Sequence, residues 1–245
     1  MKKTWLTSAH RGFCLPGMCE NTLSAIRLAA EKGADMIETD ARTSSDGVIF
    51  VNHDKEAVGF DENGNKISLI VSETNSSELK KLVLCPDDPD GTQYLPTLAE
   101  VLHLVYFYGL RVNIDLKEGE KHAEDVAKLV LEHGLRGRAV YATNGSGADT
   151  VNKILAIDPE AKFIDKPCNF TAEKLASVMD FRSKCYAYTS DFSEDNIKMI
   201  RDSGCMLAAI SLYKENINKA FSLHPDMAEY LHTSDFVELE NSLIF

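Results

Sequence analysis

Short apolar runs of strand length alternate with helical patterns along most of this 245-residue sequence. Such an alternation is typical of βα units, in which each helix crosses over between two parallel strands. The runs that we interpret as strands cover residues 4–9, 36–40, 111–117, 139–142, 162–165, 185–188, 206–210 and 234–237. Because eight strands with crossover helices in about 250 residues are typical of a (β/α)8 TIM barrel, we predict this α/β fold.

The main alternative is an open, doubly wound parallel sheet. That fold binds dinucleotides at a Gly-rich turn after its first strand, and the sequence has no such fingerprint at this place. Because alternating barrels of about 250 residues routinely form one unit, we predict a single domain over residues 1–245.

An excursion from the barrel is expected at about residues 42–95, after the second strand. Asp46 and Gly47 form a hairpin-turn signal, which predicts an antiparallel arm that ends near His53. Beyond Lys55 the periodicity is broken by Gly, Asn and Pro residues, and one short helical pattern covers residues 78–84. We therefore expect mostly loop between the arm and the next barrel helix.

Several helix ends carry capping signals. Asn21 is a candidate N-cap of the first helix, and Gly33 stands where the end of that helix favours glycine. Thr97 and Glu100 form a capping box at the start of a later helix. The acidic run at 87–90 lacks the spaced ligands and the closing glutamate of a calcium loop, so we expect a solvated turn there.

Charge and hydropathy exclude several classes of function. The chain has 26 Lys and Arg against 38 Asp and Glu, a formal net charge of -12. Its surface therefore repels phosphate polymers, and we expect no nucleic-acid partner. No apolar run approaches about 18 residues and the N-terminus lacks a signal-peptide pattern, so we expect no membrane insertion and a cytoplasmic location. The six cysteines lack paired metal-type spacing and are expected to be reduced thiols.

Reactive polar residues stand at the ends of the first three predicted strands and of the hairpin arm. In barrels of this kind the active site lies at the C-terminal ends of the strands. Side chains two residues apart on a strand project to the same side, so Glu38 should lie beside Asp40 and Asp115 beside Lys117. The candidates are His10, Arg11, Glu38, Asp40, His53, Asp115 and Lys117.

The chemistry of these residue types points to a metal and a phosphate. Three carboxylates on one side repel each other unless a cation lies among them. Oxygen-only ligation suits a hard divalent ion, so Glu38, Asp40 and Asp115 predict a Mg²⁺ or Ca²⁺ site. Two histidines, whose ordinary pKa is about 6.5, suit general acid–base catalysis. With Arg11 and Lys117 nearby, the set has the positive charge that phosphoryl chemistry requires.

Several ordered motifs occupy roughly the first half of the chain, at residues 9–12, 20–22, 33–40, 46–48, 53–54, 96–102 and 113–117. Each motif alone is a weak signal, whereas the ordered set is specific. In this set the chain resembles the glycerophosphodiester phosphodiesterase family. The resemblance implies a TIM barrel that uses a divalent metal to hydrolyse small glycerophosphodiesters, such as glycerophosphocholine, to sn-glycerol 3-phosphate and an alcohol.

The resemblance also implies a role for each candidate. The implied metal ligands are Glu38, Asp40 and Asp115, the acid–base pair is His10 and His53, and the phosphate-binding cations are Arg11 and Lys117. Either histidine could be the base. Glu20 and Asn21 are expected to be supporting residues. Both also have a local role at the start of the first helix, where Asn21 is a candidate cap and the charge of Glu20 is favourable. Glu20 is in addition a candidate for contact with the metal or its water shell.

Two alternatives stay open. A phospholipase-type relative would attack an intact lipid and would need an apolar or basic rim, against which the net charge of -12 argues. The second alternative is a barrel that binds a phosphorylated ligand without turnover, which the second half of the chain permits because it departs from the family pattern.

The first half of the chain also departs from the family pattern at one ligand position. Asp115 stands where the family usually has a glutamate, which is one methylene longer.

Overall fold

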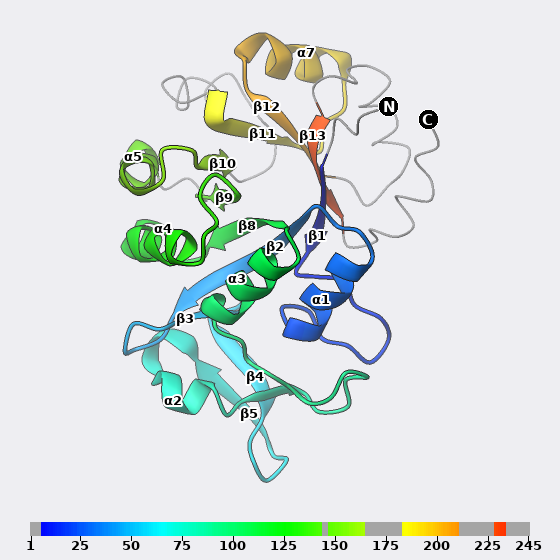
Figure 1. Ribbon diagram of the computed structural model, residues 1–245, viewed down its shortest axis with the longest axis vertical. Helices are drawn as coiled ribbons and strands as arrows, with labels where there is room; N and C mark the ends of the chain where they lie inside the picture. The colour runs from blue at the N-terminus through cyan, green and yellow to red at the C-terminus, as the bar shows by residue number, and fades with distance from the viewer. Residues whose placement is uncertain (1–5, 144–146, 165–182, 211–227, 234–245) are drawn as a thin grey trace.

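The computed structural model describes residues 6–143, 147–164, 183–210 and 228–233, and within them eight parallel strands close into a barrel (Figure 1). In order around the barrel these strands are β1 (Leu6–His10), β13 (Ala228–Thr233), β12 (Met206–Ile210), β11 (Cys185–Thr189), β10 (Lys162–Ile164), β9 (Ala139–Ala142), β8 (Arg111–Leu116) and β2 (Met36–Thr43). The pairing of β2 with β1 completes the ring. The predicted (β/α)8 fold is confirmed, and the open-sheet alternative is excluded.

Helices cover the outside of this barrel. The described α-helices that connect barrel strands are α1 (Leu23–Glu31), α3 (Leu98–Phe107), α4 (Ala123–Glu132), α5 (Gly147–Ile157) and α7 (Glu194–Ser203). A short 3-10 turn, η2 (Gly119–His122), precedes α4. In Figure 1, α5 and α4 lie to the left of the strands, α3 in front of them and α1 to their right. Their apolar faces form one continuous core with the outward side chains of the strands. None of the described helices combines the length and the apolar character needed to cross a bilayer.

Strand alternation separates core residues from site residues on β2. Ile37 and Ala41 belong to the core between barrel and helices. Glu38 and Asp40 therefore project to the opposite side, as predicted from the two-residue period. In the strand register Asp40 lies opposite Asp115 of β8, while Glu38 lies opposite His10 of β1. The register thus brings three strand ends to one place.

The strand that closes the barrel lies earlier in the chain than we predicted. Residues 234–237, interpreted as the last strand, lie outside the described residues, and β13 precedes them. Its backbone pairs with β1 over residues 230–233 and with β12 on the other side. The sequence of β13 mixes charged, aromatic and small residues and contains no apolar run that would predict a strand. The segment forms a strand because its backbone pairs with both neighbours.

The excursion contains more regular structure than expected. The predicted hairpin arm is confirmed as β3 (Ile49–Val51), which pairs antiparallel with β2. Beyond it lies a second, four-stranded antiparallel sheet with one 3-10 turn and one short helix. These elements are β4 (Glu56–Phe60), β5 (Lys66–Ile70), η1 (Val71–Glu73), α2 (Ser76–Leu79), β6 (Val83–Cys85) and β7 (Gln93–Tyr94).

Two expectations for the excursion are therefore wrong. The segment is not mostly loop, and the helical pattern at 78–84 divides between the end of α2 and the start of β6. The strands escape detection because they are short, and because the sheet buries only one face over a small core that includes Phe50, Ala57 and Leu79.

Two local interpretations at the start of α1 also need correction. The N-cap is Thr22, whose hydroxyl accepts from the Ala25 backbone N–H at 3.3 Å, and not Asn21. The acidic run at 87–90 is not a fully solvated turn, because Asp88 is buried and accepts a 2.8 Å hydrogen bond from the Ser24 hydroxyl of α1.

The capping box of α3, between Thr97 and Glu100, is confirmed. Among the described residues the free cysteines, as predicted, are Cys14, Cys19, Cys85, Cys185 and Cys205, while Cys168 lies outside them.

Candidate active site

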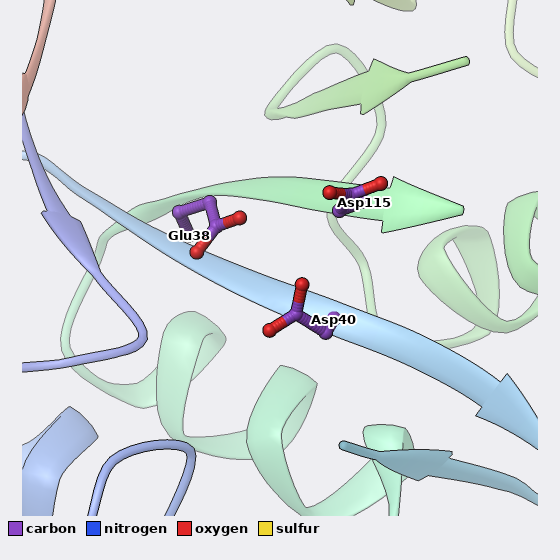
Figure 2. Close-up of side chains that lie close together, drawn as sticks. All are labelled: Glu38, Asp40 and Asp115. Carbon is purple, nitrogen blue, oxygen red and sulfur yellow. The ribbon is translucent and has the colours of Figure 1, made fainter. Parts of the chain in front are cut away.

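Three buried carboxylates meet at the C-terminal ends of neighbouring strands. Glu38 and Asp40 project from β2 and Asp115 from the adjacent β8, toward one another (Figure 2). One oxygen from each lies within 4.8 Å of one from each of the others. The three residues are only 1%, 1% and 3% exposed. Carboxylates buried this deeply are costly unless cations compensate them, so the cluster needs positive charge.

Lys117 supplies part of that charge. Its Nζ lies 3.0 Å from Asp40 Oδ1 and 2.9 Å from Asp115 Oδ2, so the ammonium bridges the two strands. Burial by itself lowers the pKa of Lys117, but the charge of Asp40 and the hydrogen bond to Asp115 outweigh it, and the net shift is upward. Lys117 is therefore protonated in this setting.

Arg11 approaches the cluster from the turn after β1. Its Nε lies 3.4 Å from Asp40 Oδ2, and its Nη1 donates a 2.6 Å hydrogen bond to Glu20 Oε1. The turn is tight because Gly12 follows with φ +89°, where a Cβ would come within 2.7 Å of the Ala25 backbone carbon. Only glycine lets this turn pack so closely on α1.

The two predicted supporting residues, Asn21 and Glu20, contact different members of the site. Asn21 is buried and its Nδ2 donates to Asp40 Oδ2 at 2.9 Å, while its Oδ1 accepts from the Thr39 hydroxyl at 3.3 Å. Asn21 thus orients a carboxylate of the cluster. Glu20, with its side chain 55% exposed, pairs with Arg11 and is not part of the converging carboxylate group found among the described residues.

The two histidines reach this end of the barrel from different elements. His10 ends β1, and its Nε2 lies 3.9 Å from Glu38 Oε2. His53 follows β3, and its Nδ1 lies 2.9 Å from Asp54 Oδ1. The hydrogen bond and the charge of His53 lower the pKa of Asp54, and the charge of Arg11 adds to this shift. The hydrogen bond to His53 therefore favours the charged form of Asp54.

One residue of this region was missed at the level of sequence. Arg42 has an 11% exposed side chain, donates two hydrogen bonds to the His53 carbonyl and lies 3.7 Å from Glu118. It continues the row of Glu38 and Asp40 along β2 at the two-residue period, which is the signal that could have found it.

The cluster has the composition of a hard-cation site. Its converging donors are carboxylate oxygens, which Mg²⁺ and Ca²⁺ prefer. Arg11 and Lys117 bring two positive charges to three carboxylates, and Arg11 shares its charge with Glu20. A divalent ion would neutralise the negative charge that remains, so the residues present fit a metal.

Residues 10–151 of the chain match the model of the Glycerophosphoryl diester phosphodiesterase family. The chain belongs to this family. The matched range covers the ends of β1, β2 and β8 and the hairpin arm, and so includes every site residue described above.

Curated relatives of the family match part of the chain. A glycerophosphodiester phosphodiesterase of Caldanaerobacter subterraneus subsp. tengcongensis is 32% identical over 144 residues, which are 56% of this chain and 57% of that protein. A glycerophosphodiester phosphodiesterase of Arabidopsis thaliana is 27% identical over 212 residues, 74% of this chain and 63% of that protein. The chain thus spans less than two thirds of the length of these relatives.

Solved structures match nearly the whole chain in fold. A glycerophosphodiester phosphodiesterase from Agrobacterium tumefaciens has a TM-score of 0.74 at 20% identity, covering 97% of this chain and 99% of that one. A phosphodiesterase from Oleispira antarctica, in complex with the product sn-glycerol-3-phosphate, has a TM-score of 0.75 at 19% identity, covering 97% and 96%. At these identities the likeness establishes the fold.

Proposed function

We propose that this family member is a metal-dependent phosphodiesterase that hydrolyses small glycerophosphodiesters to sn-glycerol 3-phosphate and an alcohol. The observation that carries the proposal is the buried carboxylate cluster of Glu38, Asp40 and Asp115, flanked by cations and a histidine at the strand ends. The names of the relatives and the product bound to the Oleispira protein support the choice of substrate class.

Glu38, Asp40 and Asp115 would hold the divalent ion, either Mg²⁺ or Ca²⁺. When bound, such an ion neutralises charge on the phosphate and makes the phosphorus more electrophilic. Asn21 keeps one Asp40 oxygen in place through its amide. Lys117 and Arg11 would bind phosphate oxygens, since both are positively charged and lie beside the carboxylate cluster.

His10 and His53 would share the proton transfers. The contact of His53 Nδ1 with Asp54 favours a proton on that nitrogen, which leaves the Nε2 lone pair to accept a proton from the attacking hydroxyl or from water. His10 Nε2, close to the Glu38 carboxylate, would then hold the proton that the leaving alcohol needs. The reverse assignment uses the same atoms, and both are consistent with general acid–base catalysis.

The proposal is tested by assaying release of glycerol 3-phosphate from glycerophosphocholine and glycerophosphoethanolamine. Protein treated with EDTA is expected to be inactive, and addition of Mg²⁺ or Ca²⁺ to restore turnover. Release of choline or phosphocholine from lysophosphatidylcholine is measured in parallel, because a lipid-cleaving relative would prefer this substrate and its cleavage yields no glycerol 3-phosphate. Folded protein that releases no product with either ion would contradict the proposal, as would turnover of the lipid alone.

A further inference from the structure

We infer that Arg42 is a positioning residue, which fixes His53 relative to the carboxylate cluster. This inference rests on the proposed function, because it assigns meaning to the location of a proposed catalytic histidine. Arg42 lies on β2 two residues beyond Asp40, and it shares with Glu38 and Asp40 the side of the strand away from the helix core.

The contacts of Arg42 converge on one backbone oxygen. Its Nε and Nη2 donate to the His53 carbonyl at 3.1 Å and 2.8 Å, a forked arrangement that restricts both the distance and the direction of the bond. The Arg42 side chain is 11% exposed, so water competes weakly for these donors. The result is a rigid link from the metal-binding strand to the turn that carries His53.

A second contact anchors the other end of the guanidinium. Arg42 Nη1 lies 3.7 Å from Glu118 Oε1, and Glu118 Oε2 accepts from the Thr43 backbone N–H at 3.0 Å. Glu118 directly follows Lys117, which bridges Asp40 and Asp115. Arg42 therefore lies between the loop after β8 and the His53 turn, and ties both to β2.

The hairpin itself does not depend on Arg42. Backbone pairing joins β2 to β3, and the Asn52 N–H donates to the Asp40 carbonyl at 3.0 Å. Asn52 Nδ2 also donates to the carbonyls of Asp54 and Glu56, which shapes the end of the turn. Loss of the guanidinium should therefore loosen His53 and leave the hairpin folded.

A double-mutant cycle tests this inference. Arg42→Met, which keeps side-chain length and loses the donors, is expected to lower kcat by about 10- to 100-fold with KM changed less than threefold, because small displacements of a catalytic group are costly. In a His53→Ala background the same change is expected to lower kcat by less than twofold, since nothing is left to position. Arg42→Lys, which can still donate to the carbonyl, should keep intermediate activity.

The control is Arg201→Met, which removes an arginine whose side chain is 47% exposed on α7 and is expected to leave kcat unchanged. Melting temperatures confirm folding, and Arg42→Lys replaces Arg42→Met in the cycle if the latter does not fold. Equal losses of kcat in both backgrounds would overturn the inference and leave the proposed function intact. An unchanged kcat in His53→Ala would instead contradict the proposed role of His53, and the inference with it.

Discussion

Replacement of His10 by alanine is expected to lower kcat for glycerophosphocholine by about 10²- to 10⁴-fold, the usual contribution of one general acid or base. The His10 ring lies at the end of β1 beside Glu38, where it would meet a phosphodiester bound by the proposed metal ion and by Arg11 and Lys117. Its side chain is 33% exposed, so alanine leaves no buried cavity and the melting temperature should stay within a few degrees of the wild-type value.

The matched control for His10 is His103, an exposed histidine on α3. His103→Ala should leave kcat and the melting temperature unchanged. Both variants are compared by steady-state kinetics at saturating metal and by thermal melting. A His10→Ala protein with wild-type kcat would remove His10 from the proposed chemistry, and equal losses in the two variants would indicate a general effect of losing a histidine.

Removal of the Lys117 ammonium is expected to destabilise the metal-free protein strongly. Lys117 bridges Asp40 and Asp115, whose side chains are 1% and 4% exposed, and its own side chain is 15% exposed. Loss of one partner from a buried ion pair typically costs about 3–5 kcal/mol, because the remaining charge is left uncompensated. Lys117→Met should therefore lower the free energy of unfolding by about this amount in EDTA, as measured by urea denaturation.

A bound divalent ion should reduce that loss, because it supplies the compensating charge and stabilises the folded state by mass action. We expect a smaller difference between Lys117→Met and wild type in saturating Mg²⁺ or Ca²⁺ than in EDTA. Lys128→Met removes an exposed ammonium on α4 that lies 3.7–3.8 Å from two carboxylates, and it should cost less than about 1 kcal/mol. The same loss for Lys117→Met with and without metal would argue that no ion binds beside it.

Most of the barrel and of its reactive end could be predicted from sequence. The sequences of β2, MIETDART, and β8, RVNIDL, place acidic residues directly beside apolar ones, so Glu38, Asp40 and Asp115 stand out against their neighbours. The two-residue period then predicts which side chains project together, and the strand register confirms that Asp40 lies opposite Asp115. Periodicity is a local property, which is why it succeeds here.

The features that were missed depend on contacts between distant segments. The excursion sheet is assembled from short strands joined across 56–94, and β13 is defined by its pairing with β1 and β12. Asn21 is a residue type that favours the N-cap position, but its backbone has φ 56° and its side-chain amide donates a hydrogen bond to Asp40. Thr22 caps α1 instead. Arg42 resembles any surface arginine until the fold brings the His53 carbonyl to it. The two-residue period along β2 could place Arg42 in the row of Glu38 and Asp40, but no local pattern predicts the contacts themselves.

The most direct test of the metal site is calorimetric titration of EDTA-treated, dialysed protein with Mg²⁺ and with Ca²⁺, for wild type and for Asp40→Asn. The Asp40 carboxylate contacts Asn21, Arg11 and Lys117. In Asp40→Asn the new side chain has the same shape as aspartate and lacks its negative charge. The account predicts one saturable ion per wild-type chain and loss of that binding in the variant. Wild-type protein that binds neither ion, or a variant that binds as tightly as wild type, would contradict a metal centre at Glu38, Asp40 and Asp115.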